Sequence, residues 1–337
     1  MFGSRKLWLV MASAALALAG CGKSDSDSAS SSPATKMYTI GFMPKQKGMK
    51  YFTSCSQGAQ EAAKELKDVN LVYDGPTDGD ATKAADLVGQ WSLQGFDAIL
   101  VSAVDPKVLG PAMKKAQDQG IKTLAWDADV ATEARSFFVS QATAEEIGNT
   151  LVDTMANDLQ SSGEVAIISA NETAANQNDW IKYMKQRLEK YPQMKLVAIE
   201  YPGEDQDKAL SAAKTLMKAH PNLKGIFGIS SASFPAAAEA VRQEGKIGKL
   251  LVTGLSTPNP MKPYVNDGTV KSVVLWNTED LGYLTVYAAE ALCKGTLKPG
   301  DTTFHAGRLG DKKIVGSTIL LGKILVFTKA NIEQYDF

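Results

Sequence analysis

The stretch QGFDAILVSAVDPKVLGPAMKKAQDQGIKTLAWDAD, residues 94–129, alternates apolar runs with polar segments. The apolar runs are residues 96–101 and 121–126, and residues 112–116 between them have helical spacing that Gly120 ends. Apolar runs without alternation are typical of strands buried on both faces of a parallel sheet. The stretch therefore predicts strand, polar loop, helix, strand and polar loop.

Small or charged residues follow each predicted strand, at 102–105 and at 127–129. In open α/β sheets, ligands bind at this carboxyl edge of the strands. Residues 222–260 repeat the same order of strand, loop, helix, strand and loop. The repetition predicts an α/β protein of two Rossmann-like, doubly wound parallel-sheet domains with facing ligand edges.

The amino terminus has the pattern of an export signal. Arg5 and Lys6 precede an apolar run at 7–19, and small residues lead to Cys21, which resembles the bacterial lipobox. We expect residues 1–20 to be a lipoprotein signal peptide and Cys21 to be acylated. Residues 21–36 are rich in Ser and Asp and predict a flexible tether. The protein should therefore be exported and lipid-anchored on the periplasmic or cell-surface face of a membrane.

The remaining part, about 300 residues, is too long for one ordinary domain and suits two. We expect one domain from residues 37–139 plus 275–302 and a second from 140–274 plus 303–337. Three hinge crossings are expected near Val139, Val274 and Thr303.

Composition limits the possible partners. A formal net charge of -1 gives no electrostatic reason to expect nucleic acid or anionic lipid as a partner, so a small or neutral ligand is expected. Of the 3 cysteines, Cys55 and Cys293 are left after Cys21, and either a disulfide or free thiols fit the pattern.

Candidate catalytic groups are sparse. The 2 histidines, His220 and His305, lack metal-ligand spacing and an adjacent nucleophile motif, and neither common phosphate-binding glycine loop is present. Asp127 and Asp129 share one loop, whereas a glycosidase places its carboxylates on opposite sides of the scissile bond. We therefore predict a binding protein with no enzymatic activity, no cofactor and no metal.

Several motifs resemble one known family. The matching pieces are PKQKGMKYFTS, YDGPT, ILVSAVDP, LAWDAD, NQNDW, GLSTPN, KPYV, LWN and the terminal YDF. With the export signal and the two α/β halves, they resemble type I periplasmic solute-binding proteins of ABC importers, in the branch of rhamnose-binding and autoinducer-2-binding proteins. This resemblance implies two domains joined by three crossings, hinge closure on the ligand, and ABC permease subunits as partners of a monomer.

The resemblance also implies a binding site. The positions that hold autoinducer-2 in that family correspond to Lys45, Asp127, Asn176 with Gln177, and the loop at 229–231. Here Asn176 replaces an aspartate, and Ile-Ser-Ser replaces a Pro-x-Ala loop. These differences, with NQN at 176–178, favour a monosaccharide such as a rhamnose-like deoxyhexose, with autoinducer-2 as the alternative.

The predicted ligand-binding residues combine hydrogen-bonding and aromatic side chains, which suit the hydroxyls and the C–H face of a sugar. They are Lys45, Phe52, Asp127, Asn176, Gln177, Ser231, Trp276 and Asn277. Further aromatic candidates are Tyr51, Trp126, Trp180 and Phe234.

Structural roles remain open for most of these residues. Asp127 and Asp129 could cap the loop, Lys45 could be a solvated lysine, and Asn176 and Gln177 could cap a helix. Trp276 and Asn277 could pack the hinge. A sensory role, with the liganded form presented to a membrane receptor kinase, is a further alternative to transport.

Overall fold

The computed structural model describes residues 36–337. The expected signal peptide, Cys21 and most of the expected tether lie outside this part of the chain.

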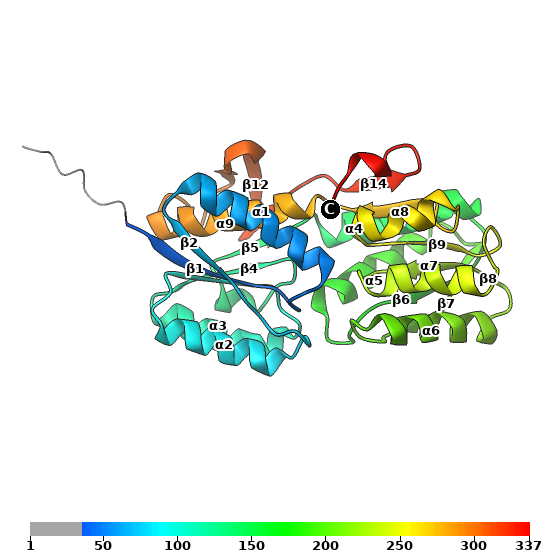
Figure 1. Cartoon of the computed structure of the whole chain (residues 1–337), viewed down its shortest axis with the longest axis horizontal. Helices are drawn as coiled ribbons and strands as arrows, with labels where there is room; N and C mark the ends of the chain where they lie inside the picture. Colours follow the sequence, from blue (N-terminus) through cyan, green and yellow to red (C-terminus); the bar gives the residue numbers. More distant parts are fainter. Residues whose placement is uncertain (1–35) are drawn as a thin grey trace, which may run out of the picture. The chain divides into compact units, whose positions relative to one another are not determined.

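A first lobe carries the strands labelled β1, β2, β4, β5 and β12 in Figure 1. It is built on a large mixed sheet with the strand order β11-β12-β13-β5-β4-β3-β1-β2. Its strands are β1 (Tyr38–Met43), β2 (Val69–Tyr73), β3 (Ala98–Val101), β4 (Lys122–Trp126), β5 (Phe137–Ser140), β11 (Thr303–His305), β12 (Asp311–Val315) and β13 (Thr318–Leu320). The strands β1 to β5 are parallel to their neighbours, and so is β13 to β5. The pairs β11-β12 and β12-β13 are antiparallel.

The sheet of the first lobe is covered on both faces. Every residue of β3 is buried; Leu100 joins the core under one pair of helices, while Ile99 and Val101 join the core under the other pair. The first pair is α1 (Lys50–Leu66) and α9 (Thr278–Lys294), and the second pair is α2 (Ala81–Leu93) and α3 (Pro106–Asp118). Burial on both sides explains why the strand sequences are apolar without alternation, as predicted.

A second lobe repeats this plan on a four-stranded parallel sheet, in the order β7-β6-β8-β9. Its elements are α4 (Ala144–Leu159), β6 (Gly163–Ile168), α5 (Ala175–Leu188), β7 (Met194–Glu200), α6 (Gln206–Ala219), β8 (Leu223–Gly228), α7 (Ser233–Gln243), β9 (Leu251–Gly254) and α8 (Pro258–Asn266). Strand β10 (Ser272–Leu275) lies beside β9 and pairs antiparallel with β14 (Leu325–Thr328). Two doubly wound sheets are therefore present, as the repeated pattern predicted.

Helices α1 and α9 pack at unusually close range through two glycines. A Cβ atom on Gly58 would overlap the backbone carbonyl of Glu279, and one on Gly282 would overlap the carbonyl of Cys55. This packing places the start of α1, which follows the loop after β1, next to the crossing that leads into α9.

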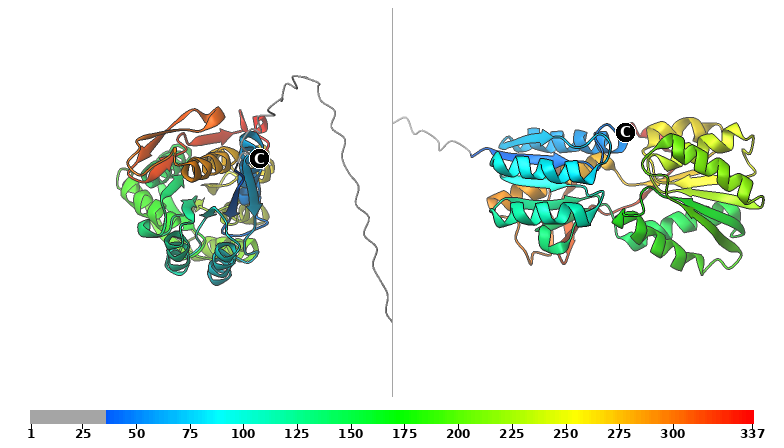
Figure 2. Two further views of the ribbon diagram at one scale, coloured as in Figure 1. Left: turned by 90° about the vertical axis from the view of Figure 1, so that its left-hand side faces the viewer. Right: turned by 90° about the horizontal axis from the view of Figure 1, so that it is seen from below.

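Three segments connect the lobes (Figure 2). They are residues 141–143 between β5 and α4, residues 276–277 between β10 and α9, and residues 321–324 between β13 and β14. The third crossing was expected near Thr303, which is wrong. Strands β11, β12 and β13 belong to the sheet of the first lobe, not to the second domain, because β13 pairs with the edge strand β5.

Candidate functional site

A small cavity of about 40 Å³ lies at the carboxyl ends of strands of both lobes. Its lining residues come from the loop after β1 and the start of α1, from the ends of β4 and β10, and from the loops and helix starts of the second lobe. They are Lys45, Met49, Tyr51, Phe52, Asp127, Asn176, Gln177, Trp180, Glu204, Ile229, Ser230, Ser231, Leu255, Leu275 and Trp276. This volume has room for no more than a few water molecules. A larger ligand therefore requires the two lobes to separate or their side chains to move.

Asp127, directly after β4, is fixed by hydrogen bonds on both carboxylate oxygens. Oδ1 accepts from the Tyr51 hydroxyl at 2.8 Å and from Gln141 Nε2 at 3.2 Å, and Oδ2 accepts from Ser102 Oγ at 2.7 Å. Its φ angle of 61° lies in the left-handed region, which few non-glycine residues adopt and which often marks functional sites. These three donors are all side chains, so the carboxylate caps neither a helix nor a loop through backbone N–H groups of the described residues.

Tyr51 links this carboxylate to the crossing between the lobes. Its hydroxyl donates to Asp127 and accepts from Trp276 Nε1 at 3.0 Å. Burial and the neighbouring carboxylate of Asp127 raise the pKa of the Tyr51 phenol well above its ordinary value, so the phenol remains protonated and able to donate. Trp276 is buried at the crossing and also lines the cavity, so its position is compatible with both roles that the sequence left open.

Lys45 connects the two lobes directly. Its Nζ atom donates to Asn176 Oδ1 at 3.0 Å and lies 3.9 Å from Asp127 Oδ2. Lys45 is only 7% exposed, which rules out the alternative of a solvated surface lysine. The bond joins the loop after β1 to the first turn of α5, so the described form is closed by a contact between side chains of the two lobes.

The side chain of Gln177 is held in place through its amide oxygen, Oε1. Oε1 accepts from Ser169 Oγ and from the Ala170 backbone N–H, both at 3.0 Å, which leaves the amide Nε2 to donate toward the cavity. Neither Asn176 nor Gln177 caps α5, because its N-cap is Ala174 and no side chain caps it. Both side chains therefore line the cavity, and neither caps the helix.

Aromatic rings form one wall. Trp276 lies edge-on to Tyr51 and at 62° to Trp180, with ring centroids 6.1 and 6.2 Å apart. Phe52 lies edge-on to Tyr51, with centroids 5.0 Å apart. All four rings line the cavity.

Two aromatic candidates lie in the cores instead. Trp126 is fully buried and stacks on Phe42 with a centroid distance of 4.2 Å, and Phe234 is fully buried in the second lobe against Gly228 and Gly254. Aromatic residues fill cores more often than they contact ligands.

Three further candidates have different positions. Ser231 lines the cavity, whereas the side chain of Asn277 accepts from the Asp280 backbone N–H and caps α9. Asn277 is absent from the cavity lining. Asp129 binds Arg135 through both carboxylate oxygens, at 2.7 and 2.6 Å, and this arginine also donates to Ser317 in the segment before β13. Asp129 therefore ties the loop after β4 to the last strands of the lobe.

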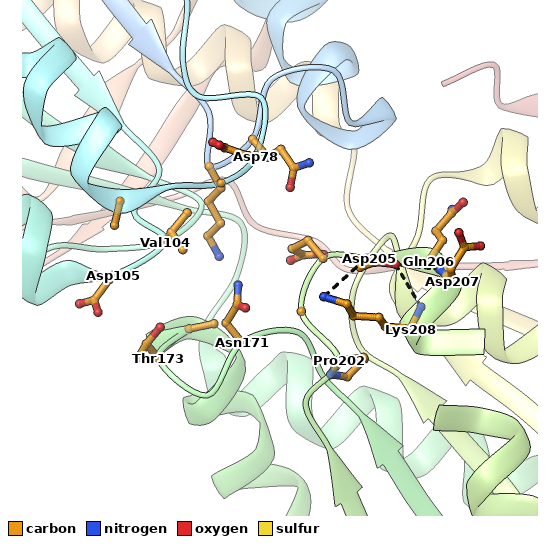
Figure 3. Close-up of a pocket in the computed structure, with 17 residues that line it drawn as sticks. Asp78, Val104, Asp105, Asn171, Thr173, Pro202, Asp205, Gln206, Asp207 and Lys208 are labelled. Carbon is orange, nitrogen blue, oxygen red and sulfur yellow. Dashed lines mark hydrogen bonds and ion pairs between the residues drawn. The ribbon is translucent and has the colours of Figure 1, made fainter. Parts of the chain in front are cut away.

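A wider groove of about 760 Å³ opens beside the cavity and shares Lys45 and Glu204 with it. Asp78 and Asp105 approach this groove from the first lobe, and Asn171, Asp205 and Lys208 approach it from the second (Figure 3). Its lining is polar on both sides, which suits the path by which a hydroxylated ligand would reach the cavity.

Glu204 is the functional candidate that sequence reasoning missed. It lies in the loop between β7 and α6, at the carboxyl edge of the second sheet, and one of its carboxylate oxygens is buried without a hydrogen-bond partner among the described residues. Its position after a predicted strand, in the acidic sequence GED, was the signal that could have identified it.

Neither of the histidines lines the cavity, and residues 36–337 hold no cluster of three or more metal-ligating side chains. Cys55 in α1 and Cys293 in α9 are free thiols, which answers the question left open by the sequence. None of the helices described for residues 36–337 has the length and apolar character needed to cross a bilayer.

A sequence-family model described as "Periplasmic binding protein domain" matches residues 40–297. The chain belongs to the periplasmic binding protein family. The predicted fold class is confirmed, and membership also confirms that the chain is a binding protein and not an enzyme.

This periplasmic binding protein is similar to solved structures across most of its length. A solute-binding protein of an ABC transporter from Clostridium phytofermentas, with bound L-rhamnose, is 29% identical with a TM-score of 0.85, covering 89% of this chain and 98% of that one. LsrB from Clostridium saccharobutylicum in complex with AI-2 is 28% identical with a TM-score of 0.84, covering 89% and 100%. The resemblance to this branch is thereby confirmed.

A curated relative gives a third comparison. The D-ribose/D-allose-binding protein of Pseudomonas aeruginosa is 27% identical over 238 residues, which cover 68% of this chain and 74% of the relative.

Proposed function

We propose that this periplasmic binding protein captures a monosaccharide between its lobes and delivers it to the membrane subunits of an ABC importer. The observation that carries the proposal is the composition of the cavity. Charged and amide groups of Lys45, Asp127 and Gln177 line the same cavity as the aromatic rings of Trp180 and Trp276. Such groups suit the hydroxyls of a sugar, and aromatic rings suit its C–H face.

L-Rhamnose or a related deoxyhexose is the proposed ligand. The similar structure with bound L-rhamnose supports this choice, and so does the position of Asn176, which hydrogen-bonds Lys45 without adding a carboxylate to the cavity. Autoinducer-2 is the second candidate, because LsrB in complex with AI-2 is structurally similar to a nearly equal degree. Titration calorimetry of the purified exported protein with L-rhamnose and with autoinducer-2 tests the choice. Binding of autoinducer-2 alone would reverse it.

Delivery requires that the bound form differ from the free form in a way that a permease can recognise. We propose that the three crossings act as a hinge and that the ligand replaces the direct bond between Lys45 and Asn176 as the link between the lobes. The mature protein would act as a monomer. A sensory role, with a receptor kinase as the partner, stays an alternative that the ligand assay alone does not test.

Membrane attachment rests on the sequence at 18–21. We propose that the protein is exported and that Cys21 carries the lipid. Replacing Cys21 with serine should leave the precursor unprocessed or release the protein, as measured by membrane fractionation and labelled fatty-acid incorporation. Normal processing with full membrane retention would contradict the lipid anchor.

A further inference from the structure

Glu204 lines both the small cavity and the wider groove beside it. Its loop is held by backbone bonds to the neighbouring strand end: Gly203 N–H donates to the Ala170 carbonyl at 3.0 Å, and Ser169 N–H donates to the Glu200 carbonyl at 2.9 Å. These two bonds fix the loop and therefore the position of Glu204 on the cavity wall.

The carboxylate of Glu204 has no evident structural task. The residue that caps α6 is Asp205, whose side chain accepts from the backbone N–H groups of Asp207 and Lys208. Ser230 and Gln177 lie near enough to favour the ionised form, yet Glu204 Oε2 is buried without a hydrogen-bond partner among the described residues. Because a buried acceptor without a partner costs stability, its position on the cavity wall points to a hydrogen-bond donor that arrives with the ligand.

The charges around Glu204 define what that partner could be. Burial and the Asp127 carboxylate raise the pKa of Glu204, while the Lys45 ammonium opposes this shift. These three are the charged residues in the lining of the cavity, so two carboxylates face one ammonium. A ligand that adds a further negative charge would be repelled, whereas a neutral ligand with hydroxyl donors would supply the missing hydrogen bond.

We propose that Glu204 is a specificity-determining residue, which accepts a hydrogen bond from a hydroxyl of a neutral sugar and excludes sugars that carry a carboxylate or phosphate. This inference rests on the proposed sugar-binding function and extends it to a residue and a ligand class. It requires movement of the lobes, because the cavity of the described form is smaller than a sugar.

The test uses the purified exported protein with Glu204→Gln, and Glu200→Gln as a matched control. Glu200 ends β7 four positions earlier and is exposed. Titration calorimetry with L-rhamnose, D-ribose and D-galacturonate should show wild-type binding of a neutral sugar and none of D-galacturonate. Glu204→Gln should weaken neutral-sugar binding by about 10- to 100-fold, because a charge-assisted hydrogen bond is lost. The ratio of neutral-sugar affinity to D-galacturonate affinity should also fall, because the variant lacks the negative charge that repels the carboxylate of D-galacturonate. Glu200→Gln should match the wild type.

Two outcomes would overturn the inference while the proposed function stands. They are unchanged neutral-sugar affinity in Glu204→Gln, and wild-type binding of D-galacturonate as tight as that of the neutral sugars. If the wild type binds none of the three sugars, the proposed function fails, and melting without added sugar decides the role of Glu204. Glu204→Gln should then melt several degrees above the wild type, because an unpaired buried charge is gone; a melting temperature at or below that of the wild type would overturn the inference.

Discussion

Asp127 is the residue on which the candidate site is centred. Its left-handed φ angle and its bonds to Tyr51, Ser102 and Gln141 hold the carboxylate in one orientation. Because asparagine also tolerates this backbone region, Asp127→Asn removes the charge without forcing a new conformation.

Asp127→Asn should weaken sugar binding by about 1.5–3 kcal/mol, the usual worth of a hydrogen bond to a charged group. The asparagine amide nitrogen cannot accept a hydrogen bond, so one oxygen's donors, Ser102 or Tyr51 with Gln141, lose their acceptor and the free energy of unfolding without sugar should fall by about 1–3 kcal/mol. Titration calorimetry and urea denaturation measure the two effects. Unchanged affinity would mean that the ligand binds elsewhere.

Tyr51→Phe tests the hydrogen-bond chain from Trp276 to Asp127. Removing the hydroxyl leaves the Trp276 indole N–H without its acceptor and takes one donor from Asp127 Oδ1. We expect the free energy of unfolding to fall by about 1–3 kcal/mol, as measured by urea denaturation. Phe42 stands in the same core without a hydroxyl, so Phe42→Leu serves as a packing control. An unchanged stability of Tyr51→Phe would contradict the importance of the chain.

Glu204 also predicts a dependence of stability on pH. Its folded-state pKa is raised above the ordinary value of 4.5, so the folded state binds the proton more tightly than the unfolded state. The stability that this group contributes is therefore lost as the pH rises from about 4.5 through the raised pKa. The melting advantage of Glu204→Gln over wild type should be small below pH 4.5 and grow above it. A difference that is constant across this range would contradict a buried carboxylate.

At the scale of elements, the glycine contact between α1 and α9 holds the first lobe together at the end that carries Tyr51 and Phe52. The close approach leaves no room for a methyl group on Gly282, because the obstacle is the backbone of α1. The crossing segment at 276–277 leads directly into α9, so this contact also positions Trp276.

Gly282→Ala should destabilise the protein by about 3 kcal/mol or more, since overpacking against backbone is relieved only by moving a helix. Gly89→Ala is the matched control. Gly89 lies on an exposed face of α2 with nothing near its Cβ position, so alanine there should raise the free energy of unfolding by about 0.5–1 kcal/mol. Guanidinium denaturation of both variants measures the difference. Equal effects at the two positions would contradict the close packing.

At the scale of the part described, residues 36–337, a mixed sheet and a parallel sheet meet at their carboxyl edges, and three short segments connect their lobes. The bond between Lys45 and Asn176 joins the lobes, and the cavity between them is too small for a sugar. Ligand entry and exit must therefore involve a change in how the lobes approach one another.

We expect the ligand-free protein to exchange between this closed form and opened forms in solution. Small-angle scattering should then show that L-rhamnose lowers the mean radius of gyration and that autoinducer-2 does not, because only a ligand with different affinities for the two forms changes their populations. Lys45→Ala removes the contact of the ligand-free closed form, so the free variant should be less compact than the free wild type. Compaction with autoinducer-2 alone would reverse the choice of ligand. Identical scattering of the two free proteins would contradict the role of Lys45.

The sequence was sufficient for what depends on local pattern. Apolar runs such as residues 96–101, helix ends such as Gly120, and polar residues after strands follow from short-range chemistry, so the two doubly wound sheets and the edge that carries Asp127 could be predicted. The family motifs added Lys45 and Gln177, which the structure places in the cavity lining.

Only the tertiary structure decided what depends on partners that are distant along the chain. Residues of strand β13 pair with residues of β5 that lie 180 positions earlier in the sequence, and the bond from Arg135 to Ser317 spans 182 positions. No local pattern shows which sheet edge a short strand will extend. The same holds for side chains: Asn277 became a helix cap, Trp126 and Phe234 filled cores, and Glu204 reached the cavity wall. Burial and pairing are set by the packing of whole elements, so neither residue type nor spacing alone could assign these roles.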